Sequence, residues 1–239
     1  MSTPTQAIED HPVVSPAEWR TAREALLAKE KEFTRLRDEL SATRRQLPWA
    51  VVDKPYTFET AAGKRTLAEL FGDKHQLVIY HFMFAPTWEA GCKSCSLWAD
   101  NFERSVVHLA HRDVQLMAVS RAPLAKLVAF RERMGWTFEW ASSGDSDFNY
   151  DFGVSFTPEQ VASGRVPYNF VEQKTGPEMP GISVFYRQGD RVMRTYSTYG
   201  RGVEMMNATY HYLDLVPKGR DEQTVGNMGW LRLRDAYGG

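Results

Sequence analysis

Residues 76–84 read QLVIYHFMF, and residues 85–95 continue as APTWEAGCKSC. The first stretch is a nearly unbroken apolar run, which is typical of a buried strand. The second is a short loop that brings the only two cysteines of the protein, Cys92 and Cys95, to the start of a segment with helical spacing of apolar residues. This strand, its loop and the cysteine pair decide both the fold that we expect and the chemistry that we look for.

The composition narrows the classes of partner. The chain has 29 Lys plus Arg against 30 Asp plus Glu, so no strongly basic field favours nucleic acid or an anionic membrane surface. Residues 1–14 lack the pattern of a signal peptide, and the apolar run at 77–84 is too short to span a bilayer. We therefore expect a cytoplasmic protein, in which two neighbouring cysteines indicate redox chemistry or a metal rather than a structural disulfide.

The N-terminal part, residues 1–45, is predicted to be a disordered tail followed by one long helix. Ser15 and Glu18 form the pattern of a capping box, with Pro16 at the first helical position, and no Gly or Pro follows up to Arg45. Apolar residues recur every seven positions, at Trp19, Leu26, Phe33 and Leu40. This narrow stripe can pack along its own domain, or it can form the contact of a homodimer.

Residues 46–215 are predicted to form one α/β domain. Strand-like and helix-like segments alternate after residue 76, which indicates βαβ units, and a hairpin follows at 182–199. An aromatic-rich stretch at 142–180 has no clear period and is predicted to be an irregular insertion. Residues 216–239 are predicted to be a C-terminal tail.

The position of the cysteines points to thiol chemistry. A cysteine in the first turn of a helix faces free backbone N–H groups and the positive end of the helix dipole, which favour the thiolate. Cys92 is the expected nucleophile, and Cys95, one turn further on, can attack a mixed disulfide and release the partner. Lys93 adds positive charge, and Trp88 precedes the pair much as an aromatic residue does in thioredoxins.

Several motifs resemble those of a thioredoxin-like family known as DUF899. They are HFMF at 81–84, GCKSC at 91–95, AVSRAPL at 118–124 and DFNYDFG at 147–153. The resemblance extends over most of the chain and implies a thioredoxin-like α/β fold, a central mixed sheet with helices on both faces, joined here to the long N-terminal helix. It implies no particular reaction.

The surroundings of the pair differ from those of working thioredoxins. Three residues stand between Trp88 and Cys92, and the strand has no buried Asp to assist proton transfer. His81 and Glu89 are the candidates for that role, although His81 can equally be a core histidine. Pro180 is the candidate for the proline that faces the cysteines.

A zinc site is the first alternative that the residues raise. Cys92, Cys95, His108 and His111 approximate a two-Cys, two-His spacing. If one helix extends from Cys95 to His111, however, Cys95 and His108 are roughly 20 Å apart and cannot bind one ion. We therefore expect no metal and no organic cofactor.

The favoured prediction is a thiol–disulfide oxidoreductase that acts on a disulfide-containing protein or a small thiol substrate and needs an external reductant. A peroxiredoxin-like thiol peroxidase is one alternative, although the Pro-x-x-x-Thr-x-x-Cys loop is absent, since Pro86 and Thr87 are adjacent. The other is a non-catalytic thioredoxin-like binding module, in which the aromatic insertion forms a pocket. Arg121, just after a predicted strand, Asp147 and Asp151 are the candidates to line this pocket.

Overall fold

The long N-terminal helix begins where the sequence predicts. The computed structural model describes residues 11–144, 146–223 and 225–238, so most of the tail predicted at 1–14 lies outside the described residues. In α1 (Pro16–Arg45) the Ser15 hydroxyl accepts a hydrogen bond from the Glu18 N–H, and the Glu18 carboxylate accepts one from the Ser15 N–H. This capping box satisfies backbone donors that a helix otherwise leaves free.

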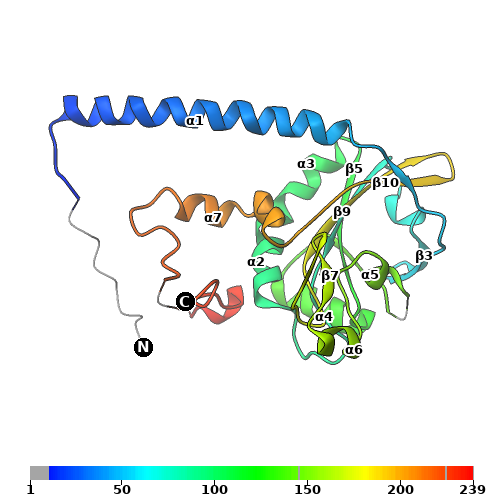
Figure 1. The fold of residues 1–239 in the computed structure, drawn as a ribbon. Helices are drawn as coiled ribbons and strands as arrows, with labels where there is room; N and C mark the ends of the chain where they lie inside the picture. Colours follow the sequence, from blue (N-terminus) through cyan, green and yellow to red (C-terminus); the bar gives the residue numbers. More distant parts are fainter. Residues whose placement is uncertain (1–10, 145, 224, 239) are drawn as a thin grey trace.

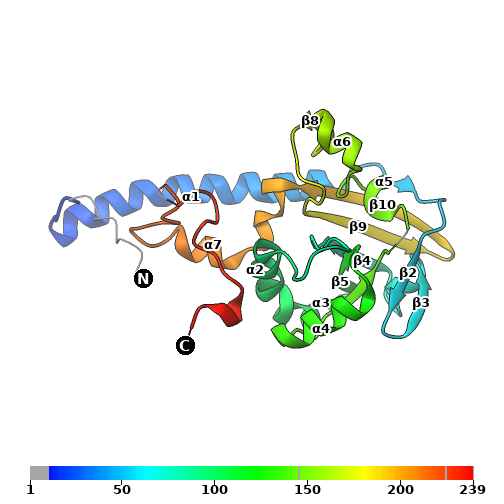
Figure 2. The same cartoon turned by 90° about the horizontal axis from the view of Figure 1, so that it is seen from below.

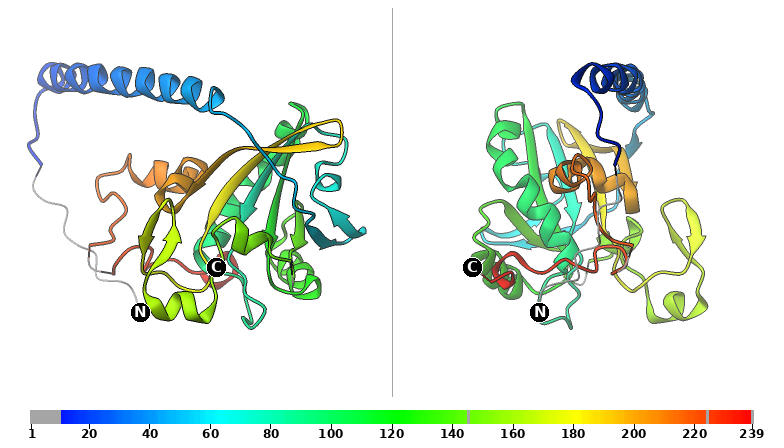
Figure 3. Two further views of the ribbon diagram at one scale, coloured as in Figure 1. Left: turned by 45° about the vertical axis from the view of Figure 1, so that its right-hand side comes forward. Right: turned by 90° about the vertical axis from the view of Figure 1, so that its left-hand side faces the viewer.

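Helix α1 extends past the edge of the domain (Figure 1). None of its residues is buried, and its last turn meets the sheet where the Arg44 guanidinium lies 4.8 Å from the centroid of the Tyr196 ring. Seen end-on, the helix lies to one side of the rest of the molecule (Figure 3). No helix in the described ranges, α1 included, is long and apolar enough to cross a membrane.

Four strands form the centre of the sheet: β4 (Gln76–His81), β5 (Val114–Ser120), β9 (Gly181–Gln188) and β10 (Arg191–Tyr199). Strands β4 and β5 are parallel, β9 is antiparallel to β4, and β10 is antiparallel to β9. The order β10-β9-β4-β5 places β4 in the interior, which explains its apolar sequence, since both of its faces are covered. This arrangement confirms the predicted thioredoxin-like fold.

Four further strands extend this sheet at both sides. Strand β6 (Glu139–Ser142) pairs in parallel with β5, and the hairpin of β2 (Thr57–Thr60) and β3 (Gly63–Thr66) follows it. At the opposite edge, the short β1 (Ala50–Val51) pairs with β10. The full order is β1-β10-β9-β4-β5-β6-β2-β3, and the sheet curls strongly (Figure 2).

One face of the sheet is covered by α2 (Lys93–Phe102), α4 (Leu124–Met134) and α7 (Ala208–Leu213), whose apolar side chains share a core with Tyr80 and Phe82. The helix predicted up to His111 is divided into α2 and two short segments, η2 (Glu103–Ser105) and α3 (Val106–Ala110).

The other face is covered by η1 (Glu69–Phe71) and α5 (Phe148–Asp151). Their side chains pack with Leu77 and Ile79 of β4 in a second core. Helical segments thus lie on both faces of the sheet, as the sequence predicts.

The stretch at 142–180 contains more regular structure than we expected. It holds α5, α6 (Pro158–Ser163) and a two-stranded sheet of β7 (Val166–Tyr168) and β8 (Val171–Gln173). Helix α6 begins with its own capping box, formed by Thr157 and Gln160. Short elements of this kind have too few residues to show a hydrophobic period, which is why the sequence pattern missed them.

The chain ends by crossing back over the first face. After β10 it forms η3 (Gly200–Met206) and α7, and a further turn, η4 (Arg234–Ala236), lies beside α4. The Arg133 guanidinium contacts the Asp235 carboxylate at 2.6 Å, and Leu231 is buried. The division into an N-terminal part at 1–45, a domain at 46–215 and a C-terminal tail at 216–239 stays a prediction.

Replacing Phe148 should show that the 142–180 stretch is part of the core. Its side chain is fully buried and its ring lies 4.9 Å from Phe58 and 4.5 Å from Phe152. We expect Phe148→Ala to lower the free energy of unfolding by about 3–5 kcal/mol, because it leaves a cavity among aromatic rings. The matched control Phe170→Ala, at a side chain that is 83% exposed, should cost less than about 1 kcal/mol. Equal effects in urea unfolding would contradict this assignment.

Candidate functional site

The cysteine pair lies at the start of helix α2, after the loop that follows strand β4. Cys92 is the N-cap residue of α2 and Cys95 lies in its first turn. The backbone of Met83, just after β4, contacts both: its carbonyl accepts a hydrogen bond from the Cys92 N–H at 3.1 Å, and its N–H donates to Cys95 Sγ at 3.4 Å. The two hydrogen bonds fix the start of the helix against the end of the strand.

Gly91 allows this close approach. A Cβ atom at this position would lie 2.8 Å from the rings of both Phe82 and Phe130. These rings belong to the buried core, so they have little room to move. Only a glycine therefore lets the loop turn into Cys92 without displacing core side chains.

The two thiols are in different protonation environments. Both cysteines are free and lie 4 Å apart; Cys92 is half-buried and Cys95 is fully buried. A hydrogen bond from the Cys95 thiol, together with backbone N–H groups of Cys95 and Ser94, lowers the pKa of Cys92 to about 6 against the opposing effect of burial. Burial and the neighbouring Cys92 raise the pKa of Cys95 well above its usual range. At neutral pH the site holds one thiolate and one thiol.

Tyr80 approaches the pair from the sheet. It is buried in the same core as Cys95, and burial, followed by the nearby Cys95 and Cys92 sulfurs, raises the pKa of its phenol well above the usual range. Tyr80 is therefore a neutral hydroxyl beside a thiolate-bearing pair. The alternation of side chains along β4 places Tyr80 on the face opposite to His81, the other titratable residue of this strand.

The structure does not bring His81 to the cysteines. Its side chain points to the other face of the sheet, where Nε2 lies 2.9 Å from the Ser183 hydroxyl and the ring centroid is 5.6 Å from that of Phe148. Burial lowers the pKa of His81 to about 3, so the ring is neutral at physiological pH. His81 is therefore a buried core histidine and not a base for the cysteines.

Three further candidates, Trp88, Glu89 and Lys93, lie close to the cysteine pair in the sequence. Glu89 has a side chain that is 94% exposed and is 3.7 Å from the Lys126 ammonium. Trp88 is half-buried against the core, and its carbonyl accepts a hydrogen bond from Lys126. Lys93 is exposed on the first turn of α2, where its charge adds to the positive end of the helix.

Arg121 belongs to a different site. Its guanidinium contacts the buried Glu178 carboxylate at 3.0 Å and lies 4.6 Å from the centroid of the Tyr150 ring. It lines a cavity of about 550 Å³ together with Lys54 and Ser142, whereas the cysteines line none of it. Asp147 lines the same cavity, so two of the residues expected to line the pocket of a binding module lie together there.

Pro180 lies at a second cavity, of about 210 Å³, that opens beside Cys95. The peptide bond before Pro180 is trans. The carbonyl oxygen of Pro180 itself accepts a hydrogen bond from the Tyr168 hydroxyl at 2.7 Å. Seven of its fifteen lining residues are aromatic or methionine: Tyr80, Met83, Trp98, Tyr168, Met179, Tyr210 and Met228. A buried thiol thus borders a small, mainly apolar cavity.

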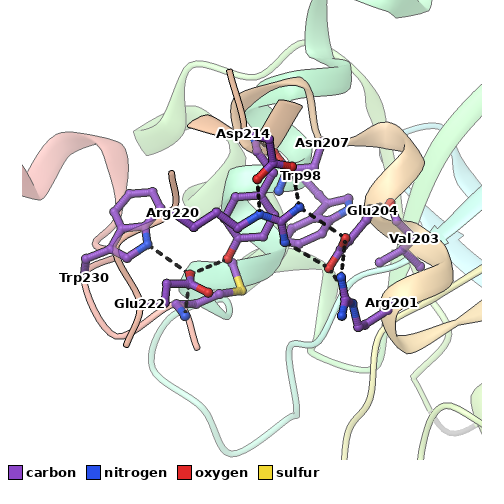
Figure 4. A network of polar contacts seen from close by, with 11 residues as sticks. Trp98, Arg201, Val203, Glu204, Asn207, Asp214, Arg220, Glu222 and Trp230 are labelled. Atoms are coloured by element: carbon purple, nitrogen blue, oxygen red, sulfur yellow. Dashed lines mark hydrogen bonds and ion pairs between the residues drawn. The ribbon is translucent and has the colours of Figure 1, made fainter. Parts of the chain in front are cut away.

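The C-terminal tail forms part of this cavity wall. Asn227 and Met228 line it, although they lie more than 130 residues after Cys95. Glu222 holds the tail in place, because a single carboxylate oxygen accepts hydrogen bonds from the Tyr210 hydroxyl at 2.7 Å, the Met228 N–H at 2.8 Å and the Trp230 indole at 3.1 Å (Figure 4). No local pattern in the sequence indicates these contacts.

A second set of charges supports the same region. The Arg220 guanidinium contacts Asp214 at 2.8 Å and Glu204 at 3.4 Å, and it lies 4.1 Å from the centroid of the Tyr210 ring (Figure 4). Tyr210 is thereby fixed on both sides, by Arg220 and by Glu222. The tail and helix α7 form one connected wall above Cys95.

Fold and site together define a thioredoxin-like protein with a Cys-x-x-Cys pair at the N-terminus of the helix that follows its central strand. The sequence matches, over residues 8–237, the family described as "Bacterial protein of unknown function (DUF899)", and the chain belongs to that family. No curated protein matches the sequence significantly.

Solved structures of similar fold include several peroxiredoxins. Peroxidoxin BcpB from Mycobacterium tuberculosis is 17% identical, with 65% of this chain and 91% of that chain covered and a TM-score of 0.43. A PrxQ variant from Xylella fastidiosa is 13% identical, with 70% and 93% covered and a TM-score of 0.40. The bacterioferritin comigratory protein of Xanthomonas campestris is 16% identical, with 70% and 92% covered and a TM-score of 0.39.

The thiolate at Cys92 can be tested by alkylation. Iodoacetamide should modify Cys92 with a rate that is half-maximal near pH 6, because only the thiolate reacts. Cys95→Ala should move this midpoint upward, since it removes the largest stabilising contact of the thiolate, whereas Cys95→Ser retains a donor and should move it less. A wild-type midpoint at the ordinary cysteine value of about 8.5 would contradict the assignment. Mass spectrometry of the labelled peptide distinguishes the two cysteines.

Removing Glu222 should open the cavity beside Cys95. Glu222→Ala leaves three donors without their acceptor, and we expect Cys95 in a Cys92→Ser background to be alkylated about tenfold faster, because local opening becomes easier. The control Glu172→Ala loses a surface ion pair of 2.8 Å with Arg165 and should leave the rate unchanged. Equal rates in both variants would show that the tail does not limit access.

Proposed function

We propose that this protein is a thiol–disulfide oxidoreductase in which Cys92 attacks and Cys95 resolves. The observation that carries the proposal is the separation of the two pKa values across a distance of 4 Å: Cys92 is a thiolate near neutral pH, while Cys95 keeps its proton. An oxidoreductase of this type needs a nucleophile that is ready to attack and a second thiol that stays inactive until the first step is complete.

The proposed reaction has two exchange steps. The Cys92 thiolate attacks one sulfur of a substrate disulfide, whose S–S bond breaks and releases one thiolate. The new Cys92–substrate disulfide is then attacked by Cys95, whose proton passes to the second departing thiolate. The substrate gains two electrons and the protein gains a Cys92–Cys95 disulfide, which an external dithiol or small thiol reduces again.

The same thiolate favours a second candidate, reduction of a peroxide. Cys92 would then attack the O–O bond, forming a sulfenic acid and releasing water or an alcohol, and Cys95 would condense with the sulfenic acid to give the same disulfide and water. The two activities are separated by supplying one thiol reductant and comparing the reduction of a protein disulfide with the consumption of hydrogen peroxide. Activity with neither substrate would favour the non-catalytic binding module.

A trapping experiment tests the order of attack. Cys95→Ser should accumulate a mixed disulfide between Cys92 and a disulfide substrate, because no thiol remains to resolve it, whereas Cys92→Ser should accumulate none. The adduct is measured by mass spectrometry without reductant and should disappear on addition of dithiothreitol. Adducts of equal yield in both variants would contradict the assignment of Cys92 as the sole nucleophile. The redox potential of the pair would then show whether the protein reduces or oxidises its substrates.

A further inference from the structure

Helix α1 presents an apolar stripe that its own domain leaves uncovered. The residues at intervals of seven are all at least half-exposed: Trp19 is 61% exposed, Leu26 52%, Phe33 65% and Leu40 56%. Leu36, on the same side, is 59% exposed. The alternative that the stripe packs along its own domain is therefore not what the structure contains, and a large apolar face in water indicates a binding surface.

The period of this stripe is that of a coiled coil. With Trp19 assigned to position a of a heptad abcdefg, the a positions are Trp19, Leu26, Phe33 and Leu40, and the d positions are Ala22, Lys29, Leu36 and Thr43. A strict repeat of seven residues is the pattern of a narrow two-stranded seam. Lys29 interrupts it once; its long stem can lie along the seam while its ammonium reaches water.

The charges beside the seam are complementary to those of a second, parallel copy of the same helix. In a parallel pair, each g residue faces the e residue five positions later on the other helix. Three of the four such pairs have opposite charges: Glu18 with Arg23, Glu32 with Arg37, and Glu39 with Arg44. The fourth pairs Ala25 with Glu30 and has no repulsion.

An antiparallel pair would lack this complementarity. It would bring g residues together and e residues together, so that Glu18 would face Glu39 and Arg23 would face Arg44. Glu32 and Arg37 also have no ion-pair partner within the described part of their own chain, whereas Arg23 is already 2.8 Å from Glu30. The charges at positions 32 and 37 are thus available to another molecule.

We propose that the protein is a homodimer held together by a parallel, two-stranded coiled coil of α1. A helix of 30 residues provides about four heptads and roughly 45 Å of seam. Since both chains leave the coiled coil at Arg45, the two thioredoxin-like domains would lie at the same end of it, with a cysteine pair in each. The proposal is independent of the reaction proposed for that pair.

Charge reversal tests the pairing. Sedimentation velocity should show a dimer for the wild type and, for Glu32→Arg or Arg37→Glu alone, a dimer at least tenfold weaker, because two symmetric pairs become repulsive. Mixing the two variants should restore a heterodimer. Asp38→Arg makes the same charge change on the outer f position and should behave as wild type. A monomeric wild type, or equal weakening by Glu32→Arg and Asp38→Arg, would overturn the proposal.

Cross-linking tests the orientation. In a Cys92→Ser/Cys95→Ser background, Ala22→Cys places a thiol at a d position, and mild oxidation should give a disulfide-linked dimer if the helices are parallel and in register. Ala28→Cys, at an outer c position, is the control and should give none. A dimer that is not cross-linked through Cys at position 22, or that persists unchanged in Leu36→Glu, would place the interface elsewhere. In chains that retain both native cysteines, an unaltered rate of Cys92 alkylation shows that the domain remains folded.

Discussion

The two hydrogen bonds made by the backbone of Met83 are the contact on which the rest of the site depends. They tie the end of an interior strand to the N-cap and first turn of α2, so the helix cannot shift along the strand without breaking them. Gly91 is needed for this arrangement, because the rings of Phe82 and Phe130 leave no room for a side chain in the loop just before Cys92. A reactive residue at a helix end, where chains commonly fray, is thereby tied to an interior strand of the sheet.

The central strand also separates two chemical environments. Tyr80 and His81 are neighbours in sequence, yet the pleat of β4 directs one toward the sulfurs and the other into a cluster of phenylalanine rings. Both side chains are neutral for the same reason, since burial disfavours their charged forms. The thiolate of Cys92 therefore has no charged acid or base from the sheet beside it, and its stability comes from hydrogen-bond donors on α2.

The parts that could be predicted from the sequence are those fixed by local rules. The start of α1 follows from Ser15 and Glu18, and the placement of Cys92 follows from an apolar strand, a short loop and a helical period. The orientation of His81 needed one more fact, namely which face of β4 carries α2, and a single strand pattern does not contain it. Glu222 could not be found at all, because its partners Tyr210 and Trp230 come together only through the path of the tail. Arg121 was placed at the correct end of a strand but its charge is directed to Glu178.

The path of the tail has a consequence for truncated forms of the protein. The strands and helices that surround Cys92 and Cys95 precede in the sequence the segment that carries Glu222, Met228 and Trp230. A chain that stops before this segment would keep the cysteine pair, but it would lose Asn227 and Met228 from the cavity wall and the buried side chain of Leu231. Truncation would therefore expose the cavity beside Cys95 and remove part of the apolar packing on the same face of the sheet.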